Sequence, residues 1–517
     1  MGRTNTKLKT IAIVLFAGAT LMSAVDPTGT PGCEYQAIDI EAYGLEAFKS
    51  PPTIRSSNGE LNIVLDVRYG TYEIAGCLVH VRSYNGQPVG PTLRLKPGDT
   101  LNMTIRNLLP PDPDPMPEDS NTPHHFNTTN LHTHGLNVDP DGISDNVLRK
   151  MAPGADYQVR VEIPEDHAPG TFWYHPHLHG STAMQVSSGM GGALIIEGGL
   201  DEVPEIAAAR EQTFMFQQIP YDDNGEIEDF EGLMGGKNWI GKLKRHATIN
   251  GQLVPVITMR PGEVRRWRFI HGGAKVALMI QLEGHKLYEI ATDGIALGKC
   301  DAWETVVLQS GYRSDVLVKA NPLEPGQESA EYWLRNEDYI EKGVSKPGED
   351  SREYLAKIVV TGPPLDMALP CGQGQLAGLV PFAPITDDEI EGTQEVVFNL
   401  VKTGEDQFKF MVNGKAFGEG GVRKLKLGSA DEWTVSTDIE SLAVRHPFHI
   451  HVNPFQMTRL DPDGNPEIVW KDTLIIEAGT PQTLRMRYVR YTGRFVLHCH
   501  FLDHEDLGMM QIVEILE

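Results

Sequence analysis

Ten of the 18 histidines in this 517-residue chain lie in four short segments, and each segment contains histidines two residues apart. The segments are residues 131–135, 174–177, 446–451 and 498–504. On a β-strand, residues i and i+2 point to the same face, so such a pair can bind a common metal ion. Neutral imidazole is a preferred ligand of copper, zinc and iron, and a cysteine thiolate adds a preference for copper. The four pairs, with a cysteine inside the last one, therefore predict a copper-binding cluster on strands.

The alternation of side chains along a strand predicts two sites rather than one. His498 and His500 face one way, whereas Cys499 between them faces the other way. His449 and His451 share a face, and His446 falls on the opposite face of a regular strand. One site therefore collects histidine pairs, and the other collects a histidine and a thiolate.

The second site has the composition of a blue-copper centre. His446 and Cys499 can be joined there by His504 and Met509 from the following loop, and a His–Cys–His set with a weak axial Met is typical of copper sites that transfer single electrons. Because the cysteine has histidine neighbours on both sides, the chain itself links the two sites covalently. Single-electron entry at one site and several coppers at the other suit the reduction of dioxygen to water.

The segments that must position these residues are predicted strands. Residues 61–67, 100–108, 157–163 and 192–197 are short, alternating or β-branched, and bounded by Gly, Pro, Asn or Asp. Helix signals are weak by comparison. The spacing favours β-sandwiches over alternating strands and helices.

An internal repeat divides the chain into three such sandwiches. An Asn-Gly turn followed by a strand and a second turn recurs about every 160 residues, at Asn85-Gly86, Asn250-Gly251 and Asn413-Gly414. We therefore predict sandwiches at residues 55–198, 205–365 and 385–517, with a Pro- and Gly-rich linker before the last. A length of 517 residues also favours about three domains.

The composition excludes one class of partner. The formal net charge is −25, with 45 Lys and Arg against 70 Asp and Glu. Nucleic-acid binding needs clustered basic residues, so we expect no nucleic-acid partner.

The first residues have the pattern of an export signal. Arg3, Lys7 and Lys9 precede a short apolar run at residues 11–24. We predict a signal peptide at residues 1–24, a periplasmic or secreted protein, and no stable membrane insertion after cleavage. A single anchoring helix is the alternative interpretation. Export permits disulfides, and Cys33, Cys77, Cys300 and Cys371 could form two in any of three connectivities.

The four segments resemble the signature motifs of the multicopper oxidases, the family of laccases, ascorbate oxidase and the bacterial cuprous oxidases. The resemblance covers nearly all of the chain after residue 55. It implies an all-β fold of three cupredoxin-like Greek-key β-sandwich domains, and four copper ions: one type 1, one type 2 and a type 3 pair. Carried over by position, it assigns His446, Cys499, His504 and axial Met509 to type 1, His132 and His449 to type 2, and His134, His175, His177, His451, His498 and His500 to the type 3 pair.

Two acids match positions that serve proton transfer in the family. Glu505 follows a predicted type 1 ligand, and Asp141 resembles the acid placed near the type 2 copper. Reduction of dioxygen consumes protons, which gives a carboxylate near the cluster a role. His179 extends the second motif by two residues, and we expect it to form hydrogen bonds rather than to bind metal.

The resemblance implies an enzyme that couples one-electron oxidation of a small donor to reduction of dioxygen to water. We favour a phenol or aromatic amine as the donor, because the 17 methionines are dispersed rather than gathered into a Cu(I)-binding segment. A metallo-oxidase acting on Cu(I), Fe(II) or Mn(II) is the alternative. A copper nitrite reductase would lack the type 3 histidines, and a copper-storage or electron-transfer protein without turnover would leave eight histidines unused.

Overall fold

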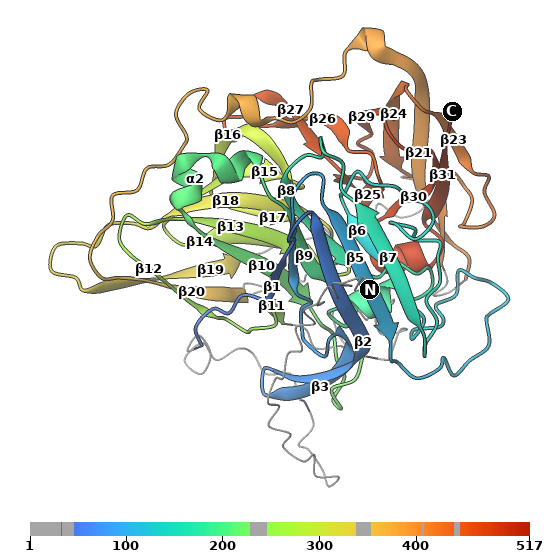
Figure 1. Ribbon diagram of the computed structural model, residues 1–517, viewed down its shortest axis with the longest axis horizontal. Helices are drawn as coiled ribbons and strands as arrows, with labels where there is room; N and C mark the ends of the chain where they lie inside the picture. The colour runs from blue at the N-terminus through green and yellow to red at the C-terminus, as the bar shows by residue number, and fades with distance from the viewer. Residues whose placement is uncertain (1–32, 34–45, 228–245, 338–352, 405–407, 439–444) are drawn as a thin grey trace, which may run out of the picture.

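The computed structural model describes residue 33 and residues 46–227, 246–337, 353–404, 408–438 and 445–517. The predicted signal peptide at residues 1–24 lies outside these ranges. The described strands form six sheets, arranged as three two-sheet sandwiches (Figure 1). The prediction of an all-β fold built from cupredoxin-like sandwiches is confirmed.

The first sandwich pairs a five-stranded sheet, in the order β1-β4-β9-β8-β6, with a four-stranded sheet, in the order β3-β2-β5-β7. Its strands are β1 (Thr53–Arg55), β2 (Glu60–Ile74), β3 (Cys77–Tyr84), β4 (Thr92–Leu95), β5 (Thr100–Asn107), β6 (His132–His134), β7 (Asp156–Glu162), β8 (Gly170–His175) and β9 (Gly192–Ile196).

The second sandwich pairs a six-stranded sheet, in the order β11-β10-β13-β18-β15-β16, with a five-stranded sheet, in the order β12-β20-β19-β14-β17. Its strands are β10 (Arg210–Gln218), β11 (Ala247–Ile249), β12 (Val256–Met259), β13 (Val264–His271), β14 (Leu278–Leu282), β15 (Leu287–Thr292), β16 (Ile295–Trp303), β17 (Thr305–Leu308), β18 (Arg313–Lys319), β19 (Ser329–Asn336) and β20 (Glu353–Thr361).

Like the second, the third sandwich pairs a six-stranded sheet with a five-stranded sheet. The strand orders are β22-β21-β24-β29-β26-β27 and β23-β31-β30-β25-β28. Its strands are β21 (Ile390–Lys402), β22 (Phe408–Val412), β23 (Arg423–Lys426), β24 (Ala430–Thr437), β25 (His446–Ile450), β26 (Phe455–Leu460), β27 (Pro466–Lys471), β28 (Thr473–Ile476), β29 (Gln482–Arg487), β30 (Gly493–Cys499) and β31 (Met510–Leu516).

The described helices are short. They are α1 (Thr182–Ser187), α2 (Pro204–Ala208) and α4 (Leu502–Asp506), with 3-10 turns η1 (Gly199–Glu202), η2 (Ala377–Leu379) and η3 (Asp387–Glu389). None of the helices in the described ranges has the length and apolar character needed to cross a membrane.

The three Asn-Gly turns of the internal repeat have the same geometry. In each turn both residues have positive φ, between 50° and 77°, as the tight turns that join antiparallel strands require. In each, the Asn side-chain oxygen accepts a hydrogen bond from the backbone of a neighbouring strand, at Asp66, Met215 and Val397. The repeat visible in the sequence is therefore a repeated structural turn.

Each sandwich is closed by an apolar core between its two sheets. Trp267 lies in the core of the second sandwich and Trp433 in that of the third, both fully buried. The core of the third sandwich also contains Cys499 and Met509. The predicted blue-copper residues thus lie at the end of a packed core, where their neighbours limit their movement.

Two disulfides decide between the connectivities that the sequence left open. Cys33 is bonded to Cys77, and Cys300 is bonded to Cys371. The second bond ties β16 to the segment between the second and third sandwiches. Cys499 is the free cysteine among the described residues and is buried.

Candidate metal centre

Two pairs of strands bring the four histidine segments together. β6 pairs with β8, with His132 opposite His175, and β25 pairs with β30, with His449 opposite His498. In Figure 1, β6 of the first sandwich lies beside β25 of the third. The rings meet across this junction: the centroids of His132 and His451 are 3.7 Å apart. The cluster therefore lies between the first and last sandwiches.

Eight histidines form this cluster, and all of them are buried. Seven of the eight have at least one buried ring nitrogen that forms no hydrogen bond within the described part of the chain; they are His132, His134, His175, His177, His449, His451 and His500. Buried polar atoms are normally satisfied, so this many unsatisfied nitrogens within one cluster indicate a missing ligand. Groups of three that can share a metal ion include His177, His451 and His498. The eighth histidine, His498, completes that group.

In three of these rings, those of His132, His175 and His449, the opposite nitrogen is held by a hydrogen bond. His132 Nδ1 lies 3.0 Å from the Asp145 carboxylate, and His449 Nδ1 donates to the Asp472 carbonyl at 2.8 Å. His175 Nδ1 donates to the Pro176 carbonyl at 2.9 Å. Such bonds place the ring hydrogen on Nδ1 and leave the Nε2 lone pair for a metal.

Electrostatics keep these imidazoles neutral, as metal ligands must be. Burial, reinforced by neighbouring histidines, lowers the pKa of His177 to about 3. Burial also lowers the pKa of His449 to about 4, although the nearby Asp472 carboxylate opposes this shift. The pKa of His132 is likewise well below its usual value, because burial disfavours the charged form. The cluster can therefore accept cations without first losing protons at neutral pH.

The second predicted site is a group of three donor atoms on the other side of the β25–β30 pair. Cys499 Sγ lies 3.5 Å from His446 Nδ1 and 3.7 Å from His504 Nδ1, and these two nitrogens are 3.1 Å apart. A point equidistant from the three atoms lies about 2.0 Å from each, by the geometry of that triangle, which is close to a metal–nitrogen bond length. The three residues fit one metal ion.

Met509 is buried beside this group. Its backbone carbonyl accepts a hydrogen bond from Cys499 N at 3.0 Å, and its own N–H donates to the His504 carbonyl at 2.9 Å. Burial raises the pKa of the Cys499 thiol well above its usual range, so a bound cation is needed to keep it as a thiolate. Axial ligation by Met509 stays a prediction.

One predicted acid is corrected. Asp141 is exposed on the loop after β6, where its backbone N–H donates to the Asp139 side chain. The carboxylate beside His132 is Asp145, which also accepts a hydrogen bond from Thr133 N at 2.7 Å. Asp145 N donates a hydrogen bond to the Asp139 carbonyl, which folds the loop back. Asp145, rather than Asp141, therefore lies against β6. Burial raises the pKa of Asp145 to about 7.

The other predicted acid, Glu505, is fully buried in α4. Its carboxylate lies 3.4 Å from His179 Nδ1, and His179 Nε2 lies 3.1 Å from the Asn121 side-chain oxygen. Burial raises the pKa of Glu505 to about 8. His179 thus forms hydrogen bonds, as expected, and connects the acid to the loop that contains Asn121.

Three contacting residues were not found from the sequence. Asp145 and Asp472 each contact a cluster histidine, and Ser310 Oγ lies 3.0 Å from His500 Nδ1. Asp472 lies 338 positions along the chain from His134, and Ser310 lies 190 positions from His500. No local sequence motif can signal a contact over such separations. Asp145 follows the first motif and lies four residues after Asp141, the acid predicted from that motif.

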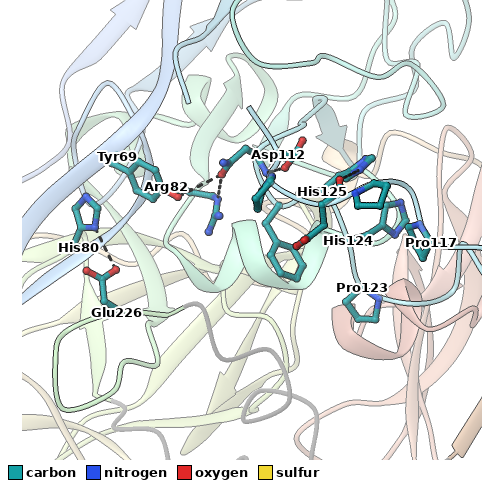
Figure 2. A pocket seen from close by; sticks show the side chains of 14 residues that line it. Tyr69, His80, Arg82, Asp112, Pro117, Pro123, His124, His125 and Glu226 are labelled. Atoms are coloured by element: carbon teal, nitrogen blue, oxygen red, sulfur yellow. Dashed lines mark hydrogen bonds and ion pairs between the residues drawn. The ribbon is translucent and has the colours of Figure 1, made fainter. Parts of the chain in front are cut away.

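A separate surface pocket of about 580 Å³ lies between β2, β3 and the loop at residues 112–127 (Figure 2). Figure 2 shows Tyr69 and Arg82 side by side, with His80 paired to Glu226. Arg82 Nε donates to the Asn127 side chain at 2.9 Å. These polar groups pair with one another, and the pocket adds no residue to either copper group.

Comparisons with known proteins agree with the geometry. Three family models described as multicopper oxidase match residues 120–200, 221–355 and 389–516. The chain is 24% identical over 479 residues to the multicopper oxidase mco of Staphylococcus aureus, covering 89% of this chain and 90% of that protein. It is 26% identical over 479 residues to a laccase of Haloferax volcanii, covering 84% and 74%.

Solved structures share the fold. A Campylobacter jejuni multicopper oxidase, described as a metallo-oxidase, superposes with a TM-score of 0.72 at 23% identity, covering 91% of this chain and 95% of that one. At this identity the likeness supports the three-sandwich architecture and does not identify a donor.

Proposed function

The chain belongs to the multicopper oxidase family, and from this premise we propose that it oxidises phenols or aromatic amines in the manner of a laccase. Members of this family are copper-dependent oxidoreductases that use dioxygen and a reducing substrate. Copper held by the His446–Cys499–His504 group and by the histidine cluster would supply one-electron oxidation of the donor and reduction of dioxygen. The chain's own residues must bind the donor, connect the two groups and supply protons.

The connection between the two groups runs through three consecutive residues of the chain. Cys499 belongs to the group with His446 and His504, while His498 and His500 belong to the cluster. His498 Nδ1 donates to the Cys499 carbonyl at 3.0 Å. An electron accepted beside Cys499 therefore has a route of bonds, covalent and hydrogen, to the cluster.

The observation that carries the choice of donor is a lysine at the outer edge of His504. Lys275, in the loop between β13 and β14, places its ammonium 3.5 Å from His504 Nε2. The ammonium can donate a hydrogen bond to the oxygen of a phenol, and through its ion pair it occupies the Asp503 oxygen that a metal ion would need. This favours a neutral or anionic organic donor over a metal ion.

A metal-ion donor is the second candidate, and one observation favours it. Asp503 pairs with Lys275 at 2.6 Å through Oδ2, but its buried Oδ1 forms no hydrogen bond to the described residues. If Lys275 moved away, this carboxylate would offer a metal ion two oxygens next to His504. A phenol would therefore need the Lys275–Asp503 ion pair intact, whereas a metal ion would need it broken.

Glu505 is suited to hold a proton for the reaction. With a pKa raised to about 8 by burial, its carboxyl is mostly protonated at neutral pH. Its hydrogen-bonding partner His179 leads to Asn121 on the loop outside. We assign Glu505 the role of proton donor to the reduction of dioxygen.

We also propose that the protein is exported to the periplasm or secreted. The apolar run at residues 11–24 is the sequence basis for this. The two disulfides support it, because such bonds persist in oxidising compartments. Detection of the protein in the exported fraction, with a mature N-terminus beyond residue 24, tests this assignment.

The test of the donor is dioxygen uptake by copper-loaded protein with a methoxyphenol, an aromatic diamine, Cu(I), Fe(II) and Mn(II) in parallel, together with a copper count per chain. Lys275→Gln removes the charge at His504. A unit charge at about 6 Å in water contributes about 0.7 kcal/mol, or about threefold in kcat/KM. We expect kcat/KM to fall for the phenol and to rise for the metal ions by about this factor.

Lys299→Gln is the matched control, because Lys299 lies in the same sandwich and is ion-paired with Asp301 at 2.8 Å. Its donor preference should equal that of the wild type. Fastest turnover with a metal ion, and loss of it in Asp503→Asn, would establish the second candidate instead. About one copper per chain and no uptake with any donor would refute the oxidase itself.

A further inference from the structure

We propose that one turn of the second sandwich, residues 310–313, holds the histidine cluster in its binding geometry, with Arg313 as the principal positioning residue. The second sandwich contributes none of the predicted copper ligands, yet this turn contacts a cluster histidine directly. The proposal depends on copper binding by the cluster and not on which donor is oxidised.

Arg313 forms a forked ion pair with Asp472 of the third sandwich. Its Nη1 lies 2.8 Å from Asp472 Oδ1, and its Nη2 contacts Oδ2. The Arg313 side chain is fully buried, and that of Asp472 is 4% exposed. A two-point contact between planar groups fixes orientation as well as distance, so Arg313 sets the plane of the Asp472 carboxylate.

Asp472 in turn holds two cluster histidines that belong to different sandwiches. Its Oδ1 lies 3.1 Å from His134 Nε2, and its backbone carbonyl accepts a hydrogen bond from His449 Nδ1 at 2.8 Å. The two rings are stacked, with centroids 3.9 Å apart. The remaining nitrogens, His134 Nδ1 and His449 Nε2, are among those left for a metal. Rotation of the Asp472 carboxylate would turn the His134 ring, and His449 is stacked on that ring.

The same turn contacts a third histidine directly. Ser310 Oγ lies 3.0 Å from His500 Nδ1. Gly311, with φ of +85°, lies so close to the His500 ring that a Cβ atom there would be 2.8 Å from it. His500 is therefore oriented by a hydrogen bond on one edge and by backbone packing beside it.

Each nitrogen of the Arg313 guanidinium forms a hydrogen bond, so the side chain has little freedom to move. Nη1 also donates to the Gly311 carbonyl at 2.9 Å, Nη2 to the Asp293 carbonyl at 2.9 Å, and Nε to the Thr171 carbonyl at 3.3 Å. Thr171 lies on β8, the strand that ends at His175. The guanidinium thus joins all three sandwiches at the cluster.

The test compares Arg313→Lys and Arg313→Met with Arg459→Met as a matched control. Arg459 bridges the same two sandwiches through Glu289 at 2.9 Å and Asp301 at 2.7 Å, away from the histidine cluster. Each variant is loaded with copper and dialysed against a chelator. Copper per chain, the electron paramagnetic resonance of the type 2 copper and the blue absorption of the type 1 copper are then measured.

We expect Arg313→Met to retain cluster copper roughly 10- to 100-fold more weakly than the wild type, the usual effect of losing a residue that orients a metal ligand. The type 2 resonance should change, whereas the blue band persists, because Arg313 does not contact His446, Cys499 or His504. Arg313→Lys keeps the positive charge but loses the two-point contact with Asp472. Its copper retention should lie between that of the wild type and that of Arg313→Met. Ser310→Ala should weaken retention in the same direction through His500.

Equal copper retention and an unchanged type 2 resonance in Arg313→Met would overturn the proposal. An equal loss in Arg459→Met would also overturn it, since the effect would then belong to the interface in general. If Arg313→Met does not fold, Arg313→Lys and Ser310→Ala are judged by the same criteria. A wild type without cluster copper would instead refute the oxidase function.

Discussion

The charge state of Glu505 gives a prediction that can be measured on copper-free protein. Its carboxyl is fully buried, and burial raises its pKa from 4.5 to about 8. The folded protein therefore binds a proton at this carboxyl over a pH range in which the unfolded chain has released it. The stability that this proton provides is complete below about pH 4.5 and is lost as the pH rises toward about 8.

The size of the effect follows from the two pKa values. Each pH unit between them corresponds to about 1.4 kcal/mol, so the free energy of unfolding falls by about 5 kcal/mol in total across the range from 4.5 to about 8. Glu505→Gln keeps the shape of the side chain and does not titrate. The stability of this variant should therefore fall less steeply than that of the wild type over the same range.

The assay is denaturant unfolding of the copper-depleted proteins at a series of pH values between about 5 and about 8, the window in which the folded and unfolded carboxyls differ. Glu391→Gln, at an exposed glutamate of the same sandwich, is the control and should follow the wild type. Parallel curves for the wild type and Glu505→Gln would refute the reasoning, because the carboxyl would then ionise in the folded protein as it does in the unfolded chain.

Three further substitutions test the copper groups. Cys499→Ser should abolish the blue colour and dioxygen uptake while leaving the cluster histidines in place, and full uptake in this variant would contradict the electron route. Met509→Leu should remain active and raise the type 1 potential in a redox titration, because a weak axial ligand is removed; a lowered potential would contradict axial ligation. Asp145→Asn should weaken type 2 copper retention roughly 10- to 100-fold by altering the hydrogen bond to His132, and unchanged retention after dialysis against a chelator would exclude that role.

The parts of the site that the sequence predicted are those governed by local geometry. The two-residue spacing of His449 and His451, and of His498 and His500, determines which face of a strand each occupies. In the structure these histidines lie in the cluster, whereas Cys499 lies with His446 and His504 on the other side. The repeated Asn-Gly turns were visible for the same reason, because a tight turn is specified by two adjacent residues.

The parts that the sequence did not predict depend on the path of a loop or on contacts between sandwiches. Asp141 and Asp145 are both acids after the first motif, and only the fold of the loop decides which one returns to His132. Asp472 lies between β27 and β28, and nothing near it in the sequence indicates that it contacts Arg313 and His134. Such residues are recognisable only when the three sandwiches are assembled.

The two copper groups differ in the sandwiches on which they depend. The side chains of β30 alternate between the core of the third sandwich, which contains Leu497 and Cys499, and the cluster, which contains His498 and His500. A one-residue shift in its pairing with β25 would move the histidines into the core, so the hydrophobic pattern that folds this sandwich also fixes the electron route. The type 1 group takes all of its ligands from the third sandwich. The cluster takes its ligands from the first and third sandwiches and is also contacted by the turn of the second. The blue copper should therefore be the more robust of the two groups to changes at the interfaces between sandwiches.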